Sequence, residues 1–487
     1  MIAPRALRAR TIVGTLALIV AAPLTALGQA TGGTPISAPA PLPTPVASST
    51  PIPYPAYGSP APDVMAQLKK PGIPQIVNLQ QAVAIAAAQS PEFATQRAQY
   101  DILRAKYGAE QSAVLPSASI AANTTRNFNQ TITTGSGAGN LSTTTTQTTQ
   151  IIANSTVSEL VFDGGRVIAG IRSAKNSDLA GRETLLRQLQ TLAFNVATAY
   201  FNVLQAEATV DSDASLVREF ETQEQNVRAQ IRIGAAARSD LAGAEFQTAQ
   251  ARGQLVVAQG LLVAAQATFA TTLGLDADAN VNPLRSSVGE EAKNLSYTTA
   301  VAQALQFRPD YLSARNSVES AKENLRFAKL AHFPVITANT TNGYSRLLPF
   351  QPRYETDKSV SLDATIPIFD QGLTNFNVAT AASQLDQANA ALVITKLTVE
   401  SDVRSALANV ISARAALVQA DAELRSAQVS LQATQAQYKV GASTITAIVT
   451  AEANLSTAQR DYVNAVYSEH LGEERYSFAL GTSDLRI

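Results

Sequence analysis

The chain has 487 residues, of which 15% are charged, and its formal net charge at pH 7 is −1. Nucleic-acid binding needs a basic surface that neutralises phosphates, so this composition argues against that class of partner. Cysteine is absent, which excludes disulfides, thiolate metal sites, cysteine nucleophiles and a lipid-modified N-terminal cysteine.

Segment 1–30 has the pattern of a secretory signal peptide. Three arginines precede an apolar run from Thr11 to Leu27, and small residues follow it. The run is short and contains Pro23, which disfavours the alternative of a membrane-anchor helix. Segment 31–75 holds twelve of the 22 prolines. We therefore expect an exported protein with an extended, Pro-rich tether.

The remaining sequence is an internal duplication. Its paired markers are Pro91 with Pro309, Pro116 with Pro334, Phe162 with Phe369, Gly234 with Gly441, and Gly274 with Gly481. The offset is 218 residues for the first two pairs and 207 for the others, so the first copy has eleven extra residues between Pro116 and Phe162. We predict a first repeat at 76–283 and a second at 284–487. Each contains a helix, a strand hairpin and a helical hairpin, and is too thin to bury a core alone.

The strand hairpins are predicted at 117–162 and 335–369. Apolar and polar residues alternate from Ser359 to Ile368, which gives one apolar and one polar face. We expect strands of about ten residues, as in outer-membrane barrels, and we place the eleven extra residues in a loop at 131–149. Four strands cannot close a barrel and open edges are not tolerated in lipid, so several chains must share one; three would supply twelve strands.

The helical hairpins are predicted at 166–275 and 373–481, where proline is absent. The first helix, Arg166–Ile231, would be about 100 Å long. Its heptad seam comprises Leu185, Leu189, Leu192, Val196, Ala199, Val203, Ala206 and Val210. The same spacing recurs 207 residues later and is interrupted only by Lys396. A second seam, from Phe194 to Ala208, indicates neighbours on two sides. Gly234 and Gly441 are placed to end the long helices.

This layout resembles the TolC-like outer-membrane efflux proteins over about 76–487. The resemblance implies a mainly α fold with a transmembrane β-barrel portion. It implies a homotrimer whose twelve-stranded barrel, in outer-membrane lipid, continues into a long α-helical coiled-coil tunnel through the periplasm. It also implies a passive duct for efflux or type I secretion, which docks a periplasmic adaptor and an inner-membrane transporter and closes at its periplasmic tip.

The resemblance extends to the turns at the helix tips. In the family a Val-Gly pair precedes a Thr and an Asp, with the Asp six positions after the Gly; Gly234, Ser239 and Asp240 fit the first copy. In the second copy, Ala447 and Thr450 stand where members can carry aspartates, and Ser443 stands in place of a gate-closing Arg. These departures weigh against cation binding at the entrance and against an Arg-to-Asp latch.

Two further residues complete the expected tip. Tyr438, three positions before Gly441, is retained, and Arg238 is an addition. The resemblance thus implies a constriction in which Tyr438 bonds to Asp240. The alternative is that Ser239 and Asp240 only favour the start of a helix, and both interpretations stay open at this point.

Two rival functions are an enzyme and a periplasmic coiled-coil scaffold or adaptor without a pore. The only histidines, His332 and His470, have no nucleophile motif or metal-ligand spacing around them, so we expect no enzyme, no cofactor and no metal. A scaffold would not need two amphipathic strand pairs. The sequence therefore favours the duct.

Overall fold

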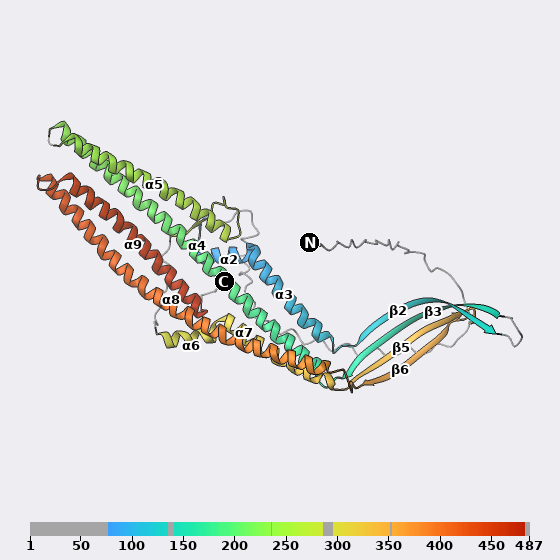
Figure 1. The fold of residues 1–487 in the computed structure, drawn as a ribbon. Helices are drawn as coiled ribbons and strands as arrows, with labels where there is room; N and C mark the ends of the chain where they lie inside the picture. The colour runs from blue at the N-terminus through green and yellow to red at the C-terminus, as the bar shows by residue number, and fades with distance from the viewer. Residues whose placement is uncertain (1–75, 135–140, 235, 286–295, 351–352, 483–487) are drawn as a thin grey trace, which may run out of the picture. The chain divides into compact units, whose positions relative to one another are not determined.

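The computed structural model describes residues 76–134, 141–234, 236–285, 296–350 and 353–482, within one compact unit, Gly58–Ile487. The predicted signal peptide at 1–30 and tether at 31–75 lie outside these residues. The described chain runs twice through short helices, a strand hairpin and two long helices (Figure 1).

The first repeat contains α2 (Leu79–Gln89), α3 (Pro91–Ser112), β2 (Ser117–Thr134), β3 (Leu141–Phe162), α4 (Arg166–Arg232) and α5 (Arg238–Thr272). The second contains α6 (Tyr297–Phe307), α7 (Pro309–Lys329), β5 (Val335–Leu348), β6 (Glu355–Thr365), α8 (Leu373–Lys439) and α9 (Ile445–Leu480). A short parallel pair, β1 (Ile76–Val77) and β4 (Asn282–Pro283), joins the two ends of the first repeat. Both α4 and α8 have 67 residues.

Two short helices precede each strand hairpin, where the sequence predicted one. The break falls at Ser90 and at Arg308, whose backbones are extended because a proline follows each of them. Pro91 and Pro309 then occupy the first turn of the next helix, where a missing N–H costs little.

The aspartates that follow Phe162 and Phe369, a duplicated pair of markers, lie at the starts of the long helices. Asp163 accepts hydrogen bonds from the N–H groups of Gly165 and Val167 at the start of α4, and Asp370 accepts them from Gly372 and Thr374 at the start of α8. These carboxylates satisfy N–H groups that have no partner within the helix.

Glycines in the left-handed conformation end the long helices. Gly234 after α4 has φ of 75° and Gly441 after α8 has φ of 74°, as a C-terminal cap requires. Gly481, after α9, also has φ of 74°, and a Cβ there would lie 2.8 Å from Arg308 Cα. The glycine-marked turns are thus confirmed as chain reversals.

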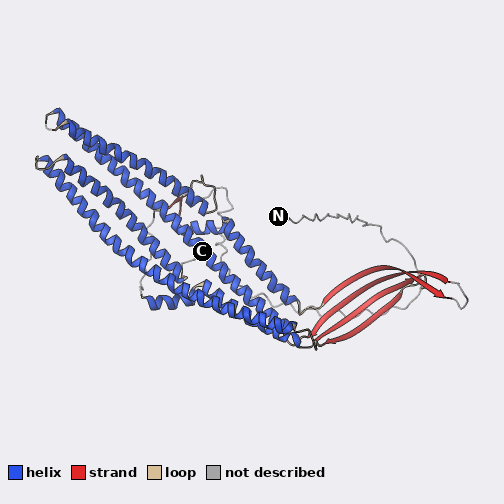
Figure 2. Ribbon diagram, in the orientation of Figure 1, coloured by secondary structure: helices blue, strands red, loops and turns tan. Residues whose placement is uncertain are grey.

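The strand hairpins form one antiparallel sheet in the order β2-β3-β5-β6 (Figure 2). The prediction of strands near ten residues is confirmed for β6, which has 11, and was wrong for β2, β3 and β5, which have 18, 22 and 14. Pairing of β2 with β3 continues to Thr134 opposite Leu141. The extra residues therefore lengthen the strands rather than form a loop at 131–149. The added segment is rich in threonine, whose branched Cβ favours extended backbone.

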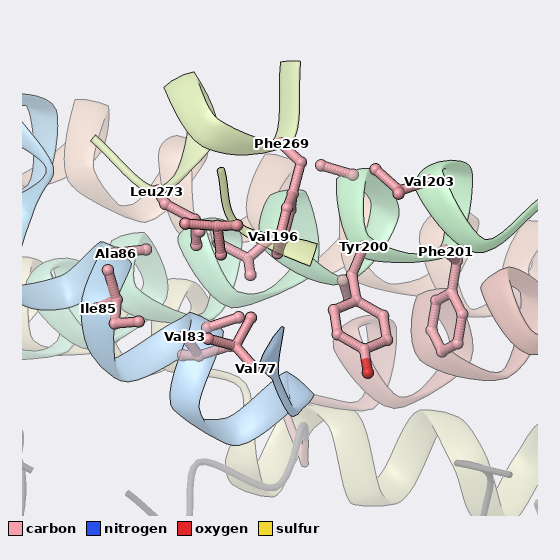
Figure 3. Packing of buried hydrophobic residues seen from close by; sticks show 14 of the residues in the cluster. Val77, Val83, Ile85, Ala86, Val196, Tyr200, Phe201, Val203, Phe269 and Leu273 are labelled. Atoms are coloured by element: carbon pink, nitrogen blue, oxygen red, sulfur yellow. The ribbon is translucent and has the colours of Figure 1, made fainter. Parts of the chain in front are cut away.

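The largest hydrophobic core lies where α2, α4 and α5 meet β1 and β4. Val77, Ile85, Val196, Tyr200 and Phe269 are each at most 2% exposed, and Figure 3 shows them interdigitating. The Tyr200 hydroxyl donates to the Leu284 carbonyl at 2.6 Å, which satisfies the polar end of this buried ring.

The predicted heptad seam is buried near its middle in both repeats. In α4 the buried members are Leu189, Val196, Ala199 and Val203, and in α8 they are Val399, Val403, Ala406 and Val410. The second seam of α4 is covered by α9: Phe194 stacks on Phe478 with ring centroids 5.1 Å apart, and Phe201 stacks on His470 at 5.5 Å. The prediction that α4 has neighbours on two sides is confirmed.

A buried arginine joins three helices of the second repeat. The Arg308 side chain is 2% exposed, and its guanidinium bonds to Asp310 at the start of α7 and to Asp402 of α8. It also donates to the Ala479 carbonyl of α9 at 3.5 Å. Since a buried guanidinium without these acceptors would be strongly destabilising, the joint depends on all three contacts.

We expect Arg308→Ala to lower the free energy of unfolding by about 2–3 kcal/mol, because it leaves the half-exposed Asp402 and a buried carbonyl without their donor. Arg285→Ala is the matched control: this guanidinium is 63% exposed and pairs with Glu207 and Asp211, so its loss should cost less than about 1 kcal/mol. Thermal unfolding followed by helical circular dichroism in detergent measures both. Equal shifts in the two variants would contradict this account.

Candidate functional site

The register of the sheet assigns its residues to two faces. One row across the sheet is Ala118, Val157, Thr340 and Val360, which lie opposite one another in turn. Other apolar residues of this face include Ile120, Ala122, Ile151, Ala153, Ile336, Ala338, Leu362 and Ala364, and the charged Glu159 lies on it opposite Ala338. Ile120 is 86% exposed and Val360 is 83% exposed. An exposed apolar band of this extent needs a nonaqueous neighbour.

The opposite face of the sheet is mostly polar, although Ile152 and Leu160 also lie on it. Its members include Ser119, Asn123, Asn154, Thr156, Asn339, Thr341, Ser361 and Asp363. Asp363 accepts hydrogen bonds from Asn339 at 2.7 Å and from Ser361 at 2.9 Å. One apolar and one polar face are what a barrel wall between lipid and a water-filled lumen requires.

The sheet has two open edges. In the described chain, β2 pairs only with β3, and β6 pairs only with β5. Their outward backbone groups have no strand partner in this part of the chain. Such edges are unsatisfied in hydrocarbon and must pair with another strand there.

The long helices lie side by side in the order α5, α4, α9 and α8 (Figure 1). Both outer helices expose apolar side chains. These residues are Phe246, Val256, Val257, Leu261 and Val263 on α5, and Val393, Ile394, Leu397, Val418 and Val429 on α8. By length and composition alone, α5 is apolar enough to cross a membrane, and only 17% of its most apolar window is buried.

At the first tip, Gly234 turns the chain and the side chains of Arg238 and Ser239 are exposed. Asp240 lies in the first turn of α5 and accepts a hydrogen bond from the Ala237 N–H at 3.1 Å. The Ser239 hydroxyl lies 3.5 Å from the second Asp240 oxygen. Asp240 therefore caps the start of α5, as one of the two interpretations of its sequence position expects.

At the second tip, after Gly441, Thr444 caps α9 by accepting the Ala447 N–H at 3.3 Å. Ser443 is half-buried, and Thr450 is exposed with its hydroxyl bonded to the Thr446 carbonyl at 2.9 Å. Sequence analysis did not single out Thr444, although a threonine just before an apolar helical segment is a typical cap.

The implied bond from Tyr438 to Asp240 is not the one that the structure shows. The Tyr438 hydroxyl donates to Gln230 Oε1 at 3.3 Å and so joins α8 to α4. Burial raises the pKa of Tyr438, and the nearby negative charge of Asp240 raises it further. Tyr438 and Asp240 are thus within electrostatic range, but a glutamine one turn before Gly234 holds the hydroxyl.

Residues 82–275 and 300–482 match the family model described as outer membrane efflux protein. The chain belongs to this family. Membership accounts for the amphipathic sheet, and it places the protein in the outer membrane with its long helices in the periplasm. The family consists of channels, and no catalytic activity is attached to it.

Among curated relatives of this efflux protein, BepC of Brucella suis is 25% identical over 319 residues, which cover 64% of this chain and 68% of BepC. TolC of Escherichia coli is 24% identical over 60% of this chain and 62% of TolC. The alignment thus spans less than two thirds of TolC. The crystal structure of the outer membrane protein VceC of Vibrio cholerae superimposes with a TM-score of 0.70 at 16% identity, over 83% of this chain and 96% of VceC. That likeness confirms the fold, a barrel portion with a helical tunnel.

One cluster in this efflux protein has the residue types of a metal site. Ligand atoms of Glu469, His470 and Glu473 on α9 lie within 4.8 Å of one another. Arg414 of α8 already lies 2.6 Å from Glu473 and 3.6 Å from Glu469, and the His470 ring stacks on Phe201. The cluster therefore acts as a link between α4, α8 and α9, since the guanidinium supplies the positive charge that a metal would bring.

Proposed function

We propose that three copies of this chain form a passive outer-membrane duct. In a tripartite efflux or type I secretion system, this duct docks a periplasmic adaptor protein and an inner-membrane transporter. The observation that carries the proposal is a four-stranded sheet with two open edges and an exposed apolar face, continuous in sequence with helices of 67 residues.

Closure of the barrel supports the trimer. Pairing β2 of one chain with β6 of the next satisfies both edges, and three chains supply twelve strands, enough for a water-filled lumen. The apolar face then meets lipid and the polar face lines the lumen. A scaffold confined to the periplasm would leave the apolar face in water, which disfavours that alternative.

The helices support the same assembly. A contact between α5 of one chain and α8 of the next buries the two apolar surfaces that a single chain exposes. This contact explains why α5 is as apolar as a membrane-spanning helix while α4, its partner in the hairpin, carries many charges. The duct itself is passive. The transporter that it docks supplies the energy for export and selects the cargo.

The tip turns at Gly234 and Gly441 are the proposed gate. A single chain holds α8 to α4 there through Tyr438 and Gln230, and Asp240 fixes the start of α5. The contact between Tyr438 and Gln230 is polar and near the end of the helices, so a small shift of the hairpins separates it, whereas the Asp240 contact stays within the turn before α5. Opening by movement of the tips needs no chemistry.

Assembly is tested with Phe246→Asp. Phe246 of α5 is 64% exposed in the single chain, and the substitution places a negative charge in the proposed contact with α8 of the next chain. We expect the wild-type protein to be extracted by detergent as a trimer and to conduct ions in planar bilayers. The variant should lose most of its trimer in size-exclusion chromatography, because burying the new carboxylate is costly. Phe246→Leu is the matched control and should stay trimeric. A monomeric wild type without conductance would refute the proposed duct.

The gate is tested with Asp240→Ala, which we expect to raise single-channel conductance because it loosens the turn before α5. The control is Ser239→Ala, since the Ser239 hydroxyl makes only a 3.5 Å contact to Asp240. Its conductance should equal the wild-type value. If Asp240→Ala lowers only thermal stability and leaves conductance unchanged, Asp240 is a helix cap and no more.

The entrance is tested with Thr450→Glu, because Thr450 is exposed about two turns beyond Gly441. Three added carboxylates facing one lumen should bind divalent cations, so we expect Mg²⁺ or Ca²⁺ to block the variant. Thr450→Gln has the same length without the charge and should not be blocked. Absence of block in Thr450→Glu would place this position outside the lumen.

A further inference from the structure

A buried carboxylate lies between the two helical hairpins, near their tips. Glu452 of α9 is only 2% exposed, although its helix begins just seven residues earlier, at Ile445. Its Oε1 atom has no hydrogen-bond partner among the described residues. It lines a small cavity together with Phe220 and Gln223 of α4 and Gln247 of α5. Glu452 thus faces the first hairpin from the second.

The surroundings of Glu452 offer no neutralising charge within the described chain. The charged group that faces it from α4 is Glu219, and α5 contributes the neutral Gln247. The α8 residues clustered on this part of α9 are Leu424, Ala427, Leu431 and the tyrosine Tyr438. Arg460, two turns further along α9, bonds to Asp213, Gln254 and Ser456. Burial, and secondarily the negative charge of Glu219, raise the pKa of Glu452 to about 7.

The duplication provides a comparison within the chain. The position 207 residues before Glu452 is Glu245 of α5, which is exposed and pairs with Arg228 at 3.0 Å. The glutamate at the same place in the first hairpin is therefore solvent-exposed and paired with a cation. Only in the second repeat is it enclosed by the facing hairpin and left without a cation.

We propose that Glu452 is a proton-operated lock on the contact between the α4–α5 and α8–α9 hairpins. As a neutral acid it packs in the cavity and holds α9 against the first hairpin. As a carboxylate beside Glu219 it requires water and pushes the hairpins apart. The proton is exchanged with solvent, so the lock closes in acid and loosens in alkali.

The sign of the pH dependence follows from the raised pKa. Since the folded form binds the proton more tightly than the unfolded chain, whose Glu has a pKa of 4.5, the contact is most stable below that value. Its contribution is lost as the pH rises through about 7. Glu219, whose pKa burial also raises, sharpens the effect because both charges would share one contact.

Hydrogen exchange of the full-length protein in detergent tests the lock without requiring channel activity. Amide exchange in residues 445–458, corrected for intrinsic rates, should accelerate about tenfold or more between pH 5.5 and 8.5, with a midpoint near 7. Glu452→Gln should abolish this step, and Glu245→Gln, the matched control, should retain it. Glu219→Gln should move the midpoint to lower pH, because one repelling charge is gone.

A wild-type protein with no step in this window, or a Glu452→Gln variant that keeps the wild-type step, would overturn the proposal. The effect on transport rests on the proposed function and is measured separately. In planar bilayers, wild-type conductance should rise with pH through the same midpoint, and Glu452→Gln should remain in the low state. If neither the wild type nor the variant conducts ions, the proposed duct function is refuted. The hydrogen-exchange result still tests the role of Glu452 independently.

Discussion

The structure depends on one constraint, the backbone hydrogen bonds at the two edges of the β2-β3-β5-β6 sheet. A strand edge in water can be solvated, but an edge in hydrocarbon cannot. The apolar face shows that this sheet is built for hydrocarbon, so its edges must meet other strands. In the proposed assembly, the trimer and its polar lumen follow from satisfying those edges.

The long helices also need neighbours, but here the contacts are made by side chains rather than by backbone hydrogen bonds. Most of the stability of a helix in a protein comes from the packing of its faces, and α4, with 67 residues, is held by α5 on one side and by α9 on the other. The α8 helix packs on α9, and over part of its length on α6 and α7, and it exposes an apolar surface elsewhere. This asymmetry between the repeats makes α4 the interior helix of the chain. The apolar surface of α8 stays exposed in a single chain, and the proposed contact with a second copy would bury it.

Features that depend on local chemistry could be predicted from the sequence. Proline-free stretches gave the long helices, and Gly234 and Gly441 marked their ends because only glycine adopts positive φ without strain. The heptad positions around Val196 and Val403 were buried as their spacing indicated. The break before Pro91 was missed, although the proline itself was the signal, since it disfavours helical backbone in the residue that precedes it.

Features that depend on packing between distant segments could not be predicted. The strand lengths were underestimated because the threonine-rich segment before Ile151 lacks the apolar alternation that marks a strand, although its branched side chains favour the extended backbone that pairs with β2. The partner of Tyr438 is Gln230, a polar residue without any distinguishing motif. Glu452 occupies an ordinary helical position, and its burial arises only when the two hairpins meet.

The unequal lengths of the two strand hairpins would shape the outer mouth of the proposed assembly. Pairing of β3 with β5 ends at Thr149 opposite Leu348, whereas β2 and β3 continue as a two-stranded ribbon for eight more residues of β3. That ribbon extends about 25 Å beyond its neighbours at the usual rise per residue. A threefold assembly would therefore carry three projecting two-stranded ribbons above the membrane. These ribbons would be the part of the protein most accessible from outside the cell, for example to an antibody against an inserted epitope tag.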